Sequence, residues 1–248
     1  MFGIVWFVIG MIACAAAPQM DAPAPVTAAD WLTQIEQKTE QVHALRAKVV
    51  YIREQGVLGD VQHRYGFLVY QAGPPAKFAI SFDRIAVSGA VRPMDKMYVF
   101  DGRYMAERDG DEKIYSRWEL VKEGEEADLL ALGEGPFALP LNLKKDAVLE
   151  RFDVELFNDG EDKPVHLGLT PKPGAAMEVT RIELWFDRQT LLPVGARSIN
   201  EESENVTHIR LADVQVNPDD LNDSAFDTAA PQEAGWQINE TSLEETTD

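Results

Sequence analysis

The sequence predicts an α+β fold built on one strongly curved antiparallel sheet. Three observations support this class: a helical pattern over residues 28–45, β-type segments joined by short turns over residues 47–120 and 165–216, and an interrupted apolar segment over residues 124–157. Consecutive hairpins favour antiparallel pairing, and a long antiparallel sheet commonly curls to protect its edges. A curled sheet with helices on its concave side would enclose an apolar cavity.

Residues 28–45 are predicted to form a helix that packs one apolar face against the sheet. Its apolar residues recur near helical spacing, with Gln, Glu and Lys between them, and are Trp31, Leu32, Ile35, Val42 and Leu45. Thr27 or Asp30 is a suitable N-cap, because either side chain can accept a hydrogen bond from a free backbone N–H of the first turn.

The strand segments alternate between two faces, and Asp101-Gly102 and Asp109-Gly110 supply hairpin turns between them. Eight residues are candidates for the wall of a lipid-binding cavity: Phe78, Ile80, Phe82, Tyr98, Phe100, Ile182, Leu184 and Phe186. For each residue taken alone the alternative is an ordinary place in the core, since most inward strand residues are core. As a set, they mark the concave face.

Residues 124–157 break the strand pattern and are predicted to form short, broken helices over the apolar interior. The candidates for a lid are Leu129, Leu130, Phe137 and Leu139. The segment that carries them is interrupted by Gly133, Gly135, Pro136 and Pro140. Such interruptions suit a lid that opens, and an ordinary irregular connection is the alternative.

The composition argues against several classes of function. The net charge is −19 with acid spread along the chain, which disfavours nucleic acid and anionic lipid surfaces as partners. None of the four histidines has a second His or Cys at metal-ligand spacing, so no metal and no cofactor is expected. No nucleophile, zinc-protease, phosphate-loop or dinucleotide motif occurs, and an enzyme is therefore not expected.

Residues 1–17 are predicted to be a signal peptide or a lipoprotein signal, because an uncharged apolar run is followed by small residues. Cys14 ends the segment Met11-Ile12-Ala13-Cys14, which resembles a lipobox, so Cys14 is a candidate for lipidation. The alternative is ordinary cleavage among the neighbouring alanines, which would remove Cys14. Residues 18–29 form a Pro/Ala-rich linker, residues 30–232 the binding domain, and residues 233–248 an acidic tail that is expected to be loose.

Several segments together resemble the LolA/LolB family of periplasmic carriers and outer-membrane receptors of lipoproteins. Residues 182–193 (IELWFDRQTLLP) and 207–217 (THIRLADVQVN), followed by Phe226 and Pro231, resemble the family's succession of strand, turn and strand. Residues 98–102 and 73–78 resemble its earlier strand and turn segments. The resemblance covers roughly residues 31–237.

This resemblance implies an incomplete β-barrel with a helical lid, whose cavity holds acyl chains of lipoproteins or other lipids. It also implies a monomer in the cell envelope, with other lipoprotein-transport components as further partners. The expected function is lipid or lipoprotein binding for outer-membrane lipoprotein sorting. The alternatives are an envelope sensory or regulatory protein on the same fold and a periplasmic hydrolase.

Overall fold

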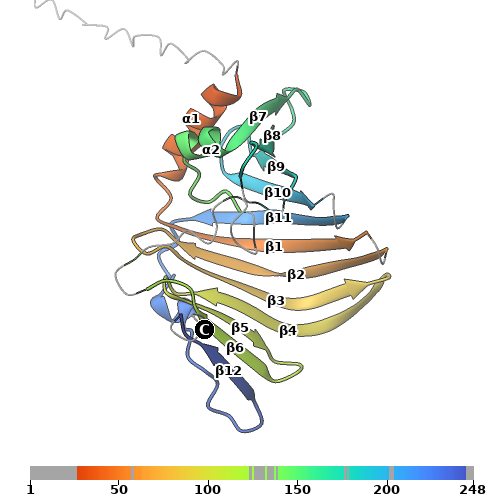
Figure 1. The fold of residues 1–248 in the computed structure, drawn as a ribbon, viewed down its shortest axis with the longest axis vertical. Helices are drawn as coiled ribbons and strands as arrows, with labels where there is room; N and C mark the ends of the chain where they lie inside the picture. The colour runs from red at the N-terminus through yellow and green to blue at the C-terminus, as the bar shows by residue number, and fades with distance from the viewer. Residues whose placement is uncertain are drawn as a thin grey trace, which may run out of the picture.

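One twelve-stranded sheet makes up most of the structure (Figure 1). The computed structural model describes residues 27–56, 59–122, 125, 132, 137, 139–175, 177, 179–200 and 204–243. The elements are α1 (Ala28–Thr39), β1 (Ala44–Gln55), β2 (Asp60–Gln71), β3 (Lys77–Val87), β4 (Ala90–Phe100), β5 (Tyr104–Asp109), β6 (Ile114–Glu119), α2 (Lys145–Arg151), β7 (Phe152–Phe157), β8 (Val165–Pro171), β9 (Arg181–Phe186), β10 (Pro193–Asn200), β11 (Asn205–Val216), the 3-10 helix η1 (Asp223–Phe226) and β12 (Gln237–Thr241).

The strand order is β12-β6-β5-β4-β3-β2-β1-β11-β10-β9-β8-β7, so two meanders meet where β1 pairs with β11. Every pair is antiparallel except β12 with β6. Register shifts between Phe82 and Arg84 and between Pro193 and Gly195 mark bulges, which bend strands. The sheet is long, curved and open, which agrees with the predicted incomplete barrel. In the strand order, β6 lies next to one edge strand and β7 is the other edge strand.

Helix α1 begins where the sequence predicts. The Thr27 side chain accepts a hydrogen bond from the Asp30 backbone N–H at 3.1 Å, and the Asp30 carboxylate accepts one from the Thr27 N–H at 3.2 Å. This reciprocal capping box satisfies two N–H groups of the helix start. The predicted helix end is wrong, because α1 stops at Thr39 and Leu45 lies in β1, paired with Tyr70. The sequence places Leu45 in the helix because its spacing from Val42 also fits a helical repeat.

The predicted broken helices are only partly present. Helix α2 is the helical part, residues 139–144 are non-helical, and Phe152–Phe157 forms the edge strand β7. The helical prediction is therefore wrong for β7. Its inward residues Phe152, Val154 and Leu156 follow a period of two, and short apolar runs do not separate strand from helix by periodicity alone.

The C-terminal segment covers part of the outer face and then joins the sheet. Phe226 of η1 packs against Ala79 of β3 and Val99 of β4. Residues 237–241 then add β12 beside β6, which corrects the expectation of a loose tail from residue 233. All five β12 residues are exposed, so backbone pairing rather than an apolar pattern holds this strand. Within the described ranges, no helix is long and apolar enough to cross a membrane.

Candidate functional site

The inner face of the sheet, to which Phe78, Ile80 and Phe82 point, carries two apolar clusters. The first cluster lies mainly on β1–β5. The second lies mainly on β7–β10 and includes residues of α1 and α2. Figure 1 shows both helices at the β7–β10 end of the sheet, away from β2–β5. The helices therefore cover the second cluster and not the first.

The eight predicted wall residues divide between these clusters. Phe78, Ile80, Phe82 and Phe100 are 0 to 2% exposed in the first cluster, and Tyr98 lies half-buried against them. The other three are fully buried in the second cluster: Ile182, Leu184 and Phe186. The sheet thus brings all eight toward the interior but does not gather them around one space.

Phe137 covers the centre of the first cluster. Its ring meets the rings of Tyr51, Phe78 and Tyr98 edge-on, with centroid distances of 5.9, 6.2 and 5.4 Å. Leu139 and Leu141 are buried in the same cluster. We call Phe137 and residues 139–141 the covering segment, because Leu132 and Leu143 are buried in the second cluster instead. Phe137 and Leu139, two of the four predicted lid residues, lie in this segment, whereas Leu129 and Leu130 lie outside the described residues.

The covering segment has little regular structure. The Leu139 N–H donates to the Phe137 carbonyl and the Leu141 N–H to the Leu139 carbonyl, each at 2.9 Å. These bonds connect residues two apart and are typical of γ-turns. The apolar side chains of Phe137, Leu139 and Leu141 are therefore the main described contact between this segment and the inner face.

The second cluster is covered by helices that are tied together. Trp31, Leu32 and Ile35 of α1 pack on it with Val148 of α2. The Lys144 ammonium, at the start of α2, lies 2.8 Å from the Glu40 carboxylate. That carboxylate and Glu36 raise the pKa of Lys144, although burial acts against them. Lys145 also donates to the Thr33 hydroxyl at 2.9 Å.

The first cluster ends in a charged group at the tips of β2–β5. The Lys96 ammonium lies 2.6 Å from Glu107 and 3.1 Å from Asp109. Burial acts to lower the pKa of Lys96, but the hydrogen bond to Glu107 and the neighbouring carboxylates raise it above its ordinary value. Burial, followed by the charge of Glu107, raises the pKa of Tyr98. Arg64 lies over the Tyr51 ring, 5.8 Å from its centroid.

The sequence analysis missed this charged group. Lys96, Tyr98 and Phe100 are two residues apart along β4, and each pairs with an inward residue of β3 or β5. The period of two that marked Tyr98 and Phe100 as inward also applied to Lys96, so the signal was present. Arg64 carries no such signal, because β2 does not alternate cleanly between apolar and polar residues.

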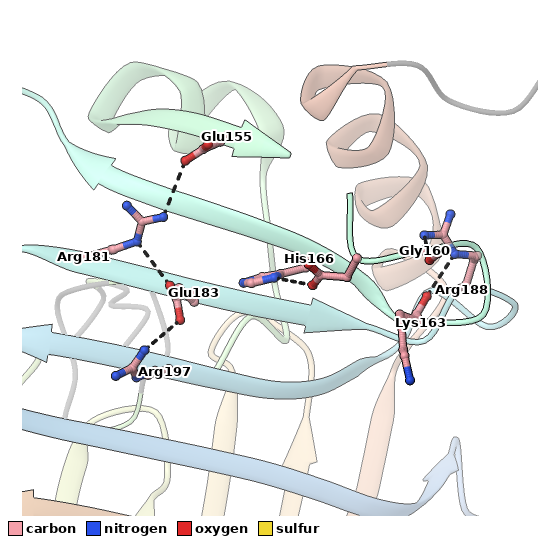
Figure 2. A network of polar contacts seen from close by, with 9 residues as sticks. Glu155, Gly160, Lys163, His166, Arg181, Glu183, Arg188 and Arg197 are labelled. Carbon is pink, nitrogen blue, oxygen red and sulfur yellow. Dashed lines mark hydrogen bonds and ion pairs between the residues drawn. The ribbon is translucent and has the colours of Figure 1, made fainter. Parts of the chain in front are cut away.

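The outer face of β7–β10 carries a separate polar network (Figure 2). Arg181 lies between Glu155 at 3.5 Å and Glu183 at 3.3 Å, and Arg197 lies 3.2 Å from Glu183. The network links β7, β9 and β10 across the sheet. These groups are partly exposed, so we interpret the network as fixing strand register more than adding stability.

An aromatic stack borders this network. The His166 ring lies between Phe157 and Trp185, with centroid distances of 4.3 and 4.6 Å, and its Nδ1 is 2.7 Å from the Asp159 carboxylate. Beside Trp185 is an outer pocket of about 320 Å³, whose lining includes Gly195, Arg197, His208 and Arg210. Burial, followed by the charges of Arg197 and Arg210, lowers the pKa of His208.

The sequence raises two further kinds of site, a metal site and a lipidated cysteine. In the described part of the chain, no three His, Cys, Asp or Glu side chains come together as a metal site. Cys14, the candidate for lipidation, lies outside the described residues.

Comparison with known proteins gives structural matches only. No family model matches the sequence, and no curated protein matches it. An uncharacterized conserved protein from Thermus thermophilus is 10% identical, with a TM-score of 0.48 over 84% of this chain and 96% of that one. A putative outer membrane lipoprotein-sorting protein domain from Vibrio parahaemolyticus is 10% identical, with a TM-score of 0.39 over 80% and 95%. A LolA superfamily protein from Nitrosomonas europaea is 12% identical, with a TM-score of 0.36 over 82% and 98%.

The descriptions of the Vibrio and Nitrosomonas structures name a lipoprotein-sorting domain and the LolA superfamily, the kind of protein that the sequence resembles. At identities of 10 to 12% and TM-scores below 0.5, these likenesses carry no argument, and function is argued from the geometry of this chain.

Proposed function

We propose that this chain is an exported, non-enzymatic binding protein that holds acyl chains of lipoproteins or other lipids on the inner face of β1–β5. The observation that carries the proposal is the cover of the first cluster. A continuous apolar face is closed by Phe137, Leu139 and Leu141 of a non-helical segment, and not by a packed helix. An acyl chain that takes the place of these three side chains would keep the sheet residues dry.

The magnitudes favour such an exchange. Burying one Phe or Leu side chain contributes about 1.5–3 kcal/mol, so lifting Phe137, Leu139 and Leu141 into water costs roughly 5–9 kcal/mol. An acyl chain of about 15 methylenes gains about 0.8 kcal/mol for each buried group, or about 12 kcal/mol in all. One acyl chain can therefore offset the loss of the cover, whereas a short apolar molecule cannot.

The location in the cell is part of the same proposal. Residues 1–17 would direct export, and residues 18–29 would separate the binding domain, residues 30–232, from the membrane if Cys14 is acylated. We propose a monomer for outer-membrane lipoprotein sorting, with other lipoprotein-transport components as partners.

Native mass spectrometry of the protein from membrane and soluble envelope fractions of its host tests the proposal. The expected result is bound phospholipid or acylated peptide that leaves after organic extraction. A covalent diacylglyceryl mass on a chain that begins at Cys14 would identify an anchored, receptor-like form. The proposal would be contradicted by a lipid-free chain in every fraction that also takes up no fatty acid after purification.

A sensory or regulatory role is the second candidate, and the outer pocket beside Trp185 favours it. Trp and Arg are enriched in the residues that contribute most to protein interfaces, and Trp185, Arg197 and Arg210 line this pocket together. Under this alternative, Arg210→Glu changes an envelope response of the host and leaves the bound lipid unchanged. A variant that behaves as the wild type in both assays would remove the alternative.

A further inference from the structure

The inner face of β1–β5 changes from apolar to polar along the strands. One row across the strands is wholly apolar and consists of Leu45, Tyr70, Phe78, Phe100 and Met105. Six residues further along β1, the row contains Tyr51, Arg64 and Ile85. At about 3.3 Å per residue, the two rows are roughly 20 Å apart. One leaflet of a bilayer provides about 15 Å for an acyl chain, so this distance accommodates one chain.

Arg64 stands at the polar end of that path, and its partners among the described residues are neutral. Its Nη2 donates to the Gln62 side-chain oxygen at 3.4 Å, its guanidinium lies over the Tyr51 ring, and its charge acts to lower the pKa of Tyr98. Its Nε is buried and has no hydrogen-bond partner. Among the residues that the structure describes, no carboxylate lies within ion-pair distance of Arg64, whereas Lys96 nearby has both Glu107 and Asp109.

A half-buried arginine without a counter-ion calls for an explanation. A buried polar group with no partner costs free energy, and a buried charge normally has an opposite charge beside it. The chain has 42 acidic residues against 23 basic ones, so carboxylates are plentiful. None of those that the structure describes lies beside Arg64. The planar guanidinium donates in a fork that matches a carboxylate or phosphate group.

We infer that Arg64 binds the oxyanion headgroup of the lipid whose acyl chain lies along the inner face. The ligand class is then a lipid with a carboxylate or phosphate head, held with its tail toward Leu45 and Phe100 and its head beside Tyr98. This inference rests on the proposed function, since it needs an acyl chain in place of the covering segment. It adds the orientation and the headgroup chemistry of the ligand.

Three single-chain probes of equal length separate headgroup from tail: dodecanoate, dodecyl phosphate and 1-dodecanol. Titration calorimetry on the full mature chain at pH 8 measures each affinity below the micelle concentration. We expect the better of the two anions to bind about tenfold or more tightly than the alcohol, as a charge-assisted hydrogen bond would give. The ranking of dodecanoate against dodecyl phosphate identifies the carboxylate or the phosphate as the preferred head.

Variants assign the preference to Arg64. Arg64→Gln should abolish the preference for the anions and leave dodecanol affinity within about twofold, while Arg64→Lys should retain part of it. Arg84→Gln is the matched control, because Arg84 is an exposed arginine over Tyr65 of the same strand pair. This control should keep the full preference.

The possible failures are distinguishable. If none of the three probes binds and hexadecanoate does not bind either, the proposed function itself is wrong. If the wild type binds all three equally, acyl-chain binding stands and the headgroup inference is overturned. If Arg64→Gln weakens all three probes by the same factor, Arg64 only supports the structure around Tyr98, and the inference is again overturned.

Discussion

The two halves of the inner face are closed by different kinds of structure. On β7–β10, helix α1 with a complete capping box packs beside α2, and Lys144 ties the two through Glu40. On β1–β5, Phe137 and its neighbours occupy the equivalent position without helical structure. Both covers bury apolar side chains to a similar extent, so burial alone does not distinguish them.

The difference lies in what else holds each cover. Removing α1 from the second cluster would break the ion pairs of Glu36 and Glu40 with Lys144 and the hydrogen bond from Lys145 to Thr33. It would also expose Trp31, Leu32 and Ile35. Lifting the covering segment exposes three side chains, whose place an acyl chain can take. Under the proposed function, the β7–β10 half is a permanent core and the β1–β5 half is a binding surface in its closed form.

The largest effect is expected in the permanent core. Leu184 is fully buried under the helices, so Leu184→Ala should lower the free energy of unfolding by about 2–5 kcal/mol through lost burial and a cavity. Urea denaturation measures this change. Fatty-acid uptake by the folded fraction should be unchanged, and a variant that gains uptake would show that this half also binds lipid.

A smaller loss of stability and a gain of binding are expected in the covering segment. Phe137→Ala removes the ring that meets Tyr51, Phe78 and Tyr98. A Phe→Ala change in a fixed core costs about 3–5 kcal/mol, but a cover that can rearrange should lose less, about 1–3 kcal/mol. Dodecanoate affinity should rise several-fold, because the ring no longer competes for the site. An unchanged or weakened affinity would count against the cover as a competitor.

A loss of about 1 kcal/mol is expected when the cap of α1 is removed. Thr27→Ala leaves the Asp30 backbone N–H without its side-chain acceptor, at the cost typical of N-caps. Urea denaturation measures the loss, and Thr27→Ser, which keeps the hydroxyl, is the matched control. Lipid affinity should not change, since α1 belongs to the permanent core, and a changed affinity would contradict that assignment.

The smallest effect is a pH dependence at the charged end of the first cluster. Burial acts to raise the pKa of Asp109, but the Glu112 backbone N–H and the Lys96 ammonium together hold it below its ordinary value. A carboxyl whose pKa is lower in the folded state stabilises the protein above its unfolded pKa, and this contribution is lost as pH falls through the folded pKa. Wild-type stability should therefore fall below about pH 4.

Asp109→Asn should reduce the fall in the free energy of unfolding between pH 7 and pH 3. Urea denaturation at pH 7, 5, 4 and 3 measures it, with the exposed Asp153→Asn as the matched control. If the two variants show the same pH dependence, Asp109 makes no special contribution.

Much of the strand content could be predicted from the sequence, because period-two alternation reports which side chains point inward. That pattern found Phe78, Ile80 and Phe82 on one strand and Ile182, Leu184 and Phe186 on another. It could not show that the two sets belong to different clusters. Their separation depends on the pairing of β1 with β11, which joins residues about 160 apart along the chain.

The errors have related physical causes. Leu45 satisfies a helical repeat and a strand alternation equally well, so only its pairing with Tyr70 decides between them. β12 is held by backbone pairing to β6 and has no apolar face to reveal it. The charged end near Arg64 is brought together by strand register across β2–β5. The period of two along β4 indicates that Lys96 points inward, but the spacing of residues along β2 does not indicate Arg64.

Hydrogen exchange of the protein with and without dodecanoate tests the central claim most directly. A peptide spanning residues 137–141 should exchange faster when dodecanoate is bound, because the covering segment leaves the inner face. Peptides from α1 and from β8–β9 should exchange at the same rate in both states. If dodecanoate binds while residues 137–141 keep their protection, or if α1 loses its protection, the division into a permanent core and a covered binding surface is wrong.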